Sequence, residues 1–243
     1  MSAPGSRAGG PGSRGSGPGS RASGPGSRAS GPGPLALLHT SPLHVPVFEA
    51  LRDEAHQGLE LRHLVVEELL ARARSEGPEA VADDVRAVLD RAVADGARAV
   101  LCTCSTIGAV AERAAAGVPV LRVDRPMAAA AVAAGPRVVV LAAVHSTLEP
   151  TVALVEEEAL RAGRRVDVRT VLVDGAWSLF EAGDTDGYAR AVAVAADAVT
   201  DADAIVLAQA SMAPAQHLTT TPTPVLSSPR PGLAAGADVV CAS

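Results

Sequence analysis

The chain has 243 residues, of which 48% are hydrophobic and 2% aromatic, so its core must be built mainly from Ala, Val and Leu. The formal net charge is −6, whereas a nucleic-acid-binding protein usually carries an excess of basic residues. All 21 basic residues are Arg, and the absence of Lys excludes Schiff-base enzymes and Walker phosphate loops because both need its amine. No apolar run reaches the roughly 18 residues of a membrane span, and three cysteines make no disulfide framework, so we expect a cytoplasmic protein without membrane or nucleic-acid partners.

Residues 1–34 form a low-complexity segment of Gly, Pro, Ser and Arg, in which the motif "GPGSR" recurs every seven residues. Such a composition buries too little apolar surface to offset its chain entropy, so we predict a disordered tail. The tail is interpreted either as a dispensable extension or as a cationic tether.

From residue 35 onward, short apolar runs alternate with helix-length Ala-rich segments. The apolar runs are residues 35–39, 59–66, 98–102, 118–123, 137–143, 166–173, 204–208 and 223–227. The clearest helical segments are residues 78–95, 106–116, 146–162 and 187–199. This alternation predicts an α/β fold with largely parallel strands joined by crossover helices.

The runs fall into two sets of four whose surroundings match at an offset of 104 or 105 residues. Pro46 corresponds to Pro150, "ARAVLCTCSTIG" to "ADAIVLAQASMA", and Arg125-Pro126 to Arg230-Pro231. Several matches at nearly one offset indicate an internal duplication.

The duplication predicts two pseudo-symmetric half-domains, residues 35–134 and 135–236, followed by a C-terminal tail over 237–243. Each half would be a mostly parallel four-stranded sheet flanked by helices. Open α/β sheets bind ligands at the carboxyl ends of their strands, so we expect the site in a cleft between the halves.

Two matched turns carry the chemistry-bearing residues. Cys104 corresponds to Gln209 and Thr106 to Ser211, each just after a strand and just before a helix. Such a turn is a ready anion site, and its helix dipole lowers the pKa of a thiol, so we expect Cys104 to be a thiolate that acts in acid–base chemistry. The alternatives are packing, which we expect for Cys102, or a metal fragment, although no ligand cluster with zinc-like spacing accompanies the pair.

These turns resemble those of the aspartate/glutamate racemase superfamily, which includes hydantoin racemases, maleate isomerases and arylmalonate decarboxylases. Cys104-Ser105-Thr106 is similar to the first catalytic turn, "Cys-Asn-Thr". Residues 208–212, "AQASM", are similar to the second, "Gly-Cys-Ala-Gly-Met", with Gln209 in place of its cysteine. The resemblance extends over residues 35–236 and implies a cofactor-independent isomerase.

The missing second cysteine restricts the implied mechanism. Two-base racemisation needs two groups that exchange protons, and the Gln209 amide is neither an acid nor a base. The resemblance therefore implies that Cys104 acts alone as acid/base or nucleophile, unless His39 or His145 is the second base. The alternatives are a one-cysteine decarboxylase or lyase, or a degenerate protein that only binds a small acid.

The resemblance also implies a small carboxylate substrate held by hydroxyl and amide donors, without a metal. The expected binding residues are Thr40, Ser41, Ser105, Thr106, Ser146, Thr147, Gln209 and Ser211. His44, His56 and His63 are expected to be surface or packing residues. The composition is compatible with a homodimer.

Overall fold

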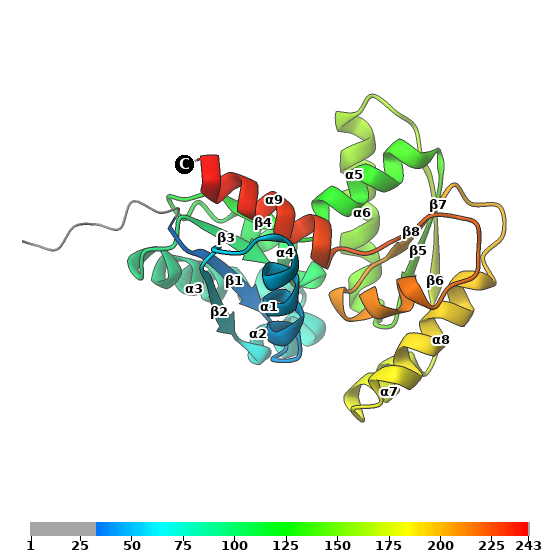
Figure 1. The fold of residues 1–243 in the computed structure, drawn as a ribbon, viewed down its shortest axis with the longest axis horizontal. Helices are drawn as coiled ribbons and strands as arrows, with labels where there is room; N and C mark the ends of the chain where they lie inside the picture. Colours follow the sequence, from blue (N-terminus) through cyan, green and yellow to red (C-terminus); the bar gives the residue numbers. More distant parts are fainter. Residues whose placement is uncertain (1–32, 243) are drawn as a thin grey trace, which may run out of the picture. The chain divides into compact units, whose positions relative to one another are not determined.

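The computed structural model of this protein describes residues 33–242 (Figure 1). The tail expected over residues 1–34 therefore lies outside the described residues, except for its last two. None of the helices within residues 33–242 is long and apolar enough to cross a membrane.

Four parallel strands form the first sheet, in the order β2-β1-β3-β4. The elements of this half are β1 (Leu35–His39), α1 (His44–Ala55), β2 (Leu61–Val65), α2 (Glu67–Glu76), the 3-10 helix η1 (Pro78–Val81), α3 (Ala82–Ala94), β3 (Ala99–Cys102), α4 (Ser105–Arg113) and β4 (Val120–Arg122). In the register, Leu35 of β1 pairs with Leu61 of β2 and with Ala99 of β3. A helix lies between each strand and the next because parallel neighbours need a crossover connection.

The second sheet has the same arrangement, in the order β6-β5-β7-β8 with all strands parallel. Its elements are β5 (Arg137–Ala142), the 3-10 helix η2 (His145–Thr147), α6 (Leu148–Arg161), β6 (Asp167–Leu172), α7 (Ala176–Glu181), α8 (Thr185–Asp197), β7 (Ala204–Leu207), the 3-10 helix η3 (Ala210–His217) and β8 (Val225–Leu226). The predicted class, two four-stranded parallel sheets flanked by helices, is confirmed.

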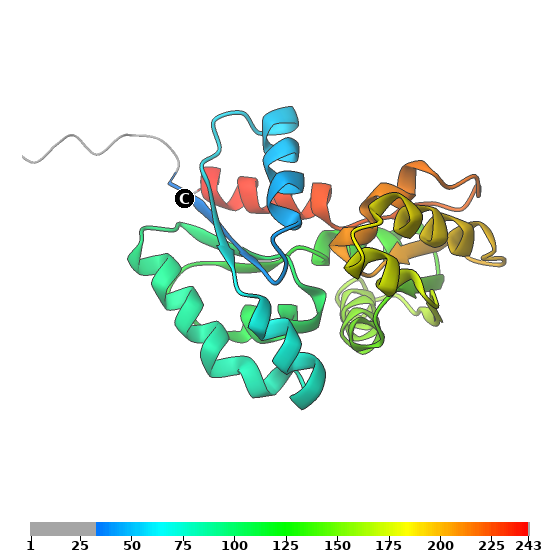
Figure 2. The same ribbon diagram turned by 90° about the horizontal axis from the view of Figure 1, so that it is seen from below.

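Helices cover both faces of the first sheet, which explains why its central strands are continuous apolar runs. Successive residues of β1 point to opposite faces. Ala36 and Leu38 pack in a cluster with α2, α3 and α4, whereas Leu35 and Leu37 pack with α1 and α9 (Pro229–Ala242). Figure 2 shows α1 and α9 on one side of this sheet and α2 and α3 on the other.

Two helices are exchanged between the halves. Helix α5 (Arg125–Ala134) follows the last strand of the first sheet, but its apolar residues pack on β5 and β7 of the second sheet. Helix α9 follows the last strand of the second sheet and packs on β1 and β3 of the first (Figure 1). Each half therefore completes the core of the other.

The approach of α9 to the first half is close enough to require a glycine. A Cβ atom at Gly232 would lie 2.4 Å from the carbonyl oxygen of Val123, a backbone atom that cannot rotate away. Helix α9 also includes residues 237–242, where the sequence analysis expected a tail. Ala237 and Val240 are buried against the first sheet, so this end of the chain is part of its core.

Candidate active site

A pocket lies at the carboxyl ends of the strands and is lined from both halves. It contains every residue that the sequence analysis selected for a site: Thr40, Ser41, Cys104, Ser105, Thr106, Ser146, Thr147, Gln209 and Ser211. They come from the β1–α1 loop, the β3–α4 turn, η2, and the β7–η3 turn. The topology brings these segments together because parallel strands end at the same edge of a sheet. The space between the lining residues, its open mouth included, is about 450 Å³.

Cys104 lies immediately before α4, with extended backbone angles of φ −106° and ψ 116°. Its side chain is only 7% exposed. Burial raises the pKa of the thiol, and this effect exceeds the opposing effect of the neighbouring Thr40 and Thr106 hydroxyls and of the backbone N–H groups of Ile107 and Thr106. The expectation that the helix start would make Cys104 a thiolate is therefore wrong. At neutral pH the residue is a protonated thiol, which suits it to donate a proton.

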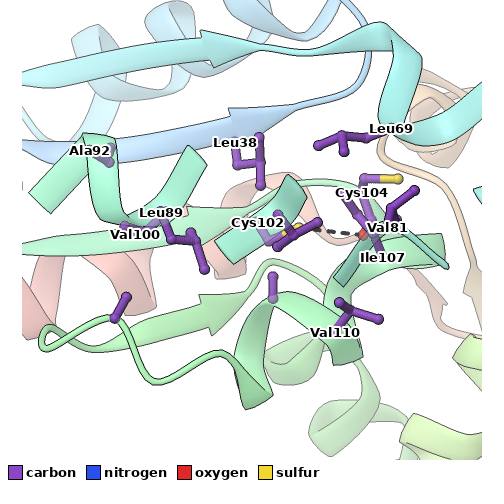
Figure 3. Packing of buried hydrophobic residues seen from close by; sticks show 14 of the residues in the cluster. Leu38, Leu69, Val81, Leu89, Ala92, Val100, Cys102, Cys104, Ile107 and Val110 are labelled. Atoms are coloured by element: carbon purple, nitrogen blue, oxygen red, sulfur yellow. Dashed lines mark hydrogen bonds between the residues drawn. The ribbon is translucent and has the colours of Figure 1, made fainter. Parts of the chain in front are cut away.

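Cys102 is a core residue, as expected. Its thiol donates a long hydrogen bond of 3.7 Å to the carbonyl oxygen of Cys104, and burial raises its pKa. Figure 3 shows both cysteines in one buried cluster with Ile107 and Val110 of α4, with the two sulfur atoms pointing in different directions. Cys102 does not line the pocket. Within residues 33–242, no group of three or more His, Cys, Asp or Glu side chains could hold a metal ion.

Several of the pocket hydroxyls are already engaged in the fold. Ser105 donates to the carbonyl oxygen of Ala208 at 2.6 Å, a bond that ties the two matched turns together. Thr147 donates to the carbonyl oxygen of Val144 at 2.6 Å. The Ser211 hydroxyl lies 2.9 Å from the Tyr188 hydroxyl. The protons of Ser105 and Thr147 are therefore not available to a ligand.

Other polar atoms of the pocket have no such partner. Five buried side-chain nitrogen or oxygen atoms within the described residues lack a hydrogen bond, and three of them belong to pocket residues: Thr106 Oγ1, Ser146 Oγ and His44 Nδ1. Buried polar groups in folded proteins are nearly always paired. One hydroxyl from each half, together with one imidazole nitrogen, is therefore free to bind a polar ligand.

Gln209 is held in a defined orientation by the backbone that follows β5. Its Oε1 accepts a hydrogen bond of 2.6 Å from the backbone N–H of Ala143, and the residue is only 8% exposed. An acceptor role for the oxygen leaves the amide nitrogen, with its two N–H donors, as the group that can address the pocket. Gln209 therefore presents a fixed hydrogen-bond donor to the pocket.

The histidines differ from the expectations. Neither His39 nor His145 lines the pocket, although both were considered as a second base. His44, which was expected on the surface or in packing, lines it. His44 follows Thr40 by four residues, so the first turn of α1 places it at the same edge of the sheet as the β1–α1 loop.

His39 belongs instead to a hydrogen-bonded chain that runs from Thr103, a pocket residue, to Glu49. Its Nδ1 lies 2.8 Å from the Thr103 hydroxyl and its Nε2 lies 2.8 Å from His63 Nδ1. His63 Nε2 in turn donates to Glu49 at 2.9 Å. Burial, with smaller contributions from the neighbouring His44 and His63, lowers the pKa of His39 to about 3. His39 is therefore neutral at physiological pH and has no free nitrogen for a substrate.

The family follows from a comparison of the sequence with models of known protein families. A model of the Asp/Glu/hydantoin racemase family matches residues 45–235. The chain belongs to this family. A comparison with curated proteins finds no sequence match.

Solved structures of this racemase family share the fold of the chain. Aspartate racemase from Picrophilus torridus is similar with a TM-score of 0.67 and 16% identity, over 85% of this chain and 93% of the other. Glutamate racemase RacE1 from Bacillus anthracis gives a TM-score of 0.68 and 14% identity, over 85% of this chain and 81% of the other. A glycine-to-cysteine mutant of arylmalonate decarboxylase, in a sulfate-associated form, gives a TM-score of 0.56 and 19% identity, over 85% of this chain and 92% of the other.

One wall of this racemase-family pocket is apolar and aromatic, which the sequence analysis missed. Trp177 and Phe180 of α7, with ring centroids 4.9 Å apart, and Leu70 of α2 line it. The guanidinium of Arg74 lies 5.8 Å above the Trp177 ring. No lining residue carries an Asp, Glu or Arg side chain. The signal was present in the sequence, because a chain with four Trp, Tyr and Phe residues has three of them within residues 177–188.

Proposed function

We propose that this protein is a cofactor-independent enzyme of the racemase superfamily that transfers a proton at the carbon next to a carboxylate group, with Cys104 as the proton donor. The fold is shared by an aspartate racemase, a glutamate racemase and an arylmalonate decarboxylase. Each of these names describes a reaction at such a carbon, which supports the same type of chemistry here.

A single observation carries the proposal: a buried thiol shares one pocket with unpartnered hydroxyl groups from both halves. Thr106 Oγ1 and Ser146 Oγ lack partners, and the Gln209 amide has its nitrogen free to donate. Donors arranged in this way stabilise the negative charge that develops on a carboxylate when the adjacent carbon becomes a carbanion. The first turn of α4 adds backbone N–H groups beside the Cys104 thiol.

The chemical step is a protonation of the enediolate formed from the substrate. The electron pair left on the carbon is shared with the two carboxylate oxygens, which Thr106, Ser146 and Gln209 would bind. Cys104 gives its S–H proton to the carbon, a C–H bond forms, and the thiol becomes a thiolate that regains a proton afterwards. Its raised pKa supports this role because a proton donor must be protonated at rest.

The substrate's remaining substituent would lie against Trp177 and Phe180. Stacked aromatic rings favour contact with flat or apolar groups, and the pocket lining has no Asp, Glu or Arg side chain to pair with a charged one. We therefore propose a small carboxylate, or an amino-acid derivative such as a hydantoin, whose side group is apolar.

Two other functions use the same pocket. In a one-cysteine decarboxylase, the bond to a second carboxylate breaks, CO₂ leaves, and the electron pair forms the same enediolate for Cys104 to protonate. In a binding protein, the pocket would hold a small acid without turnover. Gln209, in place of a second cysteine, favours both over a symmetrical two-cysteine racemase.

The test is product formation, followed by NMR in D₂O over a panel of free amino acids, 5-substituted hydantoins, 2-substituted malonates and maleate. Wild type would be compared with Cys104→Ala and with Cys102→Ala, a matched control that removes the neighbouring buried thiol outside the pocket. We expect turnover of at least one compound, its loss in Cys104→Ala, and its retention in Cys102→Ala.

The outcomes separate the candidates. Racemisation, double-bond isomerisation or CO₂ release identifies the reaction. Turnover that survives in Cys104→Ala would contradict the assigned role. If no compound turns over, but one of the acids raises the melting temperature, the binding-protein function is the better one.

A further inference from the structure

His44 has the position of a group that acts on a ligand. It is the first residue of α1 and it lines the same pocket as Cys104. Among the described residues that line this pocket, His44 and Cys104 are the only ones with a titratable side chain. The lining otherwise consists of hydroxyl, amide, aliphatic and aromatic side chains.

The fold makes no use of the free nitrogen of His44. Its Nδ1 is buried and has no hydrogen-bond partner, whereas His39 and His63 have theirs within the buried chain that ends at Glu49. The His44 ring is positioned by packing, edge-on to the His39 ring with centroids 6.0 Å apart. A buried imidazole nitrogen without a partner is costly, and a polar ligand in the pocket would satisfy it.

The two titratable groups are in complementary protonation states. Burial lowers the pKa of His44 to about 4, so at neutral pH its imidazole is a free base. Burial raises the pKa of Cys104, so at the same pH its thiol carries a proton. His39 of β1 is the titratable group that faces the His44 ring, and it is neutral under these conditions. At neutral pH the pocket thus contains one unprotonated imidazole, which can accept a proton, and one protonated thiol, which can donate one.

We propose that His44 is the second proton-transfer residue of this enzyme and performs the role for which the chain lacks a second cysteine. The proposal rests on the proton-transfer function given above. His44 removes the proton from the carbon next to the carboxylate, the C–H electron pair forms the enediolate, and Cys104 donates its proton to the other face of the carbon. The products of the step are an imidazolium and a thiolate. Proton exchange with solvent then restores the neutral imidazole and the thiol.

The experiment uses single enantiomers of the panel compound that the wild type racemises, in D₂O, and follows both exchange at the carbon and interconversion. Without Cys104, the neutral His44 imidazole can still remove and return the proton of the enantiomer that presents its C–H bond to it, whereas without His44 the protonated Cys104 thiol has no base as its partner. We expect His44→Gln to reduce both interconversion and exchange by about 10²-fold or more, and Cys104→Ala to lose interconversion but keep exchange of one enantiomer. His56→Gln, which removes a histidine at the far end of α1, is the matched control and should interconvert the enantiomers at the wild-type rate.

Two results would overturn the proposal while leaving the function of Cys104 intact. One is wild-type interconversion in His44→Gln, and the other is a wild type that only decarboxylates and never exchanges a C–H proton. If His44→Gln does not fold, Cys104→Ala decides by itself. Exchange of one enantiomer in Cys104→Ala supports His44 as the base, and loss of exchange in both enantiomers contradicts it, because Cys104 would then be the base. Failure of the whole panel with wild-type protein is a different outcome, because it removes the function on which this proposal rests.

Discussion

His39 should make the folded protein sensitive to mild acid. Its ring is fully buried and has neighbours at both nitrogens, and its pKa falls from the ordinary 6.5 to about 3 in the folded state. The unfolded chain therefore binds a proton near pH 6.5 that the folded chain does not accept until about pH 3. The stabilisation is complete above pH 6.5 and is lost progressively as the pH falls toward 3.

The size of the effect follows from the distance between the working pH and the ordinary pKa. At pH 5 the unfolded imidazole is about 1.5 pH units below its pKa of 6.5, and each unit corresponds to about 1.36 kcal/mol. His39 alone should thus lower the free energy of unfolding by about 2 kcal/mol between pH 7.5 and pH 5. That is a large share of the stability of a typical protein.

The assay is urea denaturation of wild type and His39→Gln at both pH values and at equal ionic strength. Glutamine cannot titrate, so the loss of stability between pH 7.5 and pH 5 should be smaller in the variant by about 2 kcal/mol. Circular dichroism at each pH would check that both proteins begin folded. An equal loss in the two proteins would refute the reasoning, because it would mean that His39 accepts a proton within the fold at no cost.

Two further predictions concern the burial of an ion pair and of the cysteines. Asp124 accepts two hydrogen bonds of 2.9 Å from the Arg122 guanidinium, whose side chain is only 3% exposed. Asp124→Asn should lower the free energy of unfolding by about 3–5 kcal/mol, because it leaves this buried guanidinium without its counter-charge. Glu54→Gln, at an exposed pair with Arg230, is the control, and a similar loss in both variants would contradict the burial argument. A thiol reagent such as Ellman's should react rapidly with the exposed Cys241 and slowly with the buried Cys102 and Cys104, whose pKa values are raised. Cys241→Ser should remove the fast phase, and fast reaction of three thiols would contradict the burial of the other two.

Much of the architecture was readable from local patterns. The eight apolar runs became the eight strands. For the central strands β1, β3, β5 and β7 the reason is that a short apolar run bounded by helical segments suits a strand that is covered on both faces. The parallel topology then required that residues directly after the strands share one edge. For this reason the β1–α1 loop and the turn at Cys104, far apart in sequence, could be expected together.

Other features depended on contacts between distant parts of the chain. Helices α5 and α9 are Ala-rich and apolar, so each could cover either sheet, and only the complete packing selects the sheet of the opposite half. The thiol pKa is another example, because the turn lowers it by its position whereas burial raises it by more. A sequence shows the helix start but not the depth of burial.

The sequence by itself determined the strands, the internal duplication, the racemase-type turns and the polar residues at the ends of the strands. The tertiary structure decided which of those polar groups are free: Ser105 and Thr147 donate to backbone carbonyls, whereas Thr106 and Ser146 have no partner. It also decided that His44, and not His39, faces the pocket. The reason is physical. Periodicity encodes how a segment folds and which side it buries, but hydrogen-bond pairing and burial depend on neighbours that the chain supplies from far along its length.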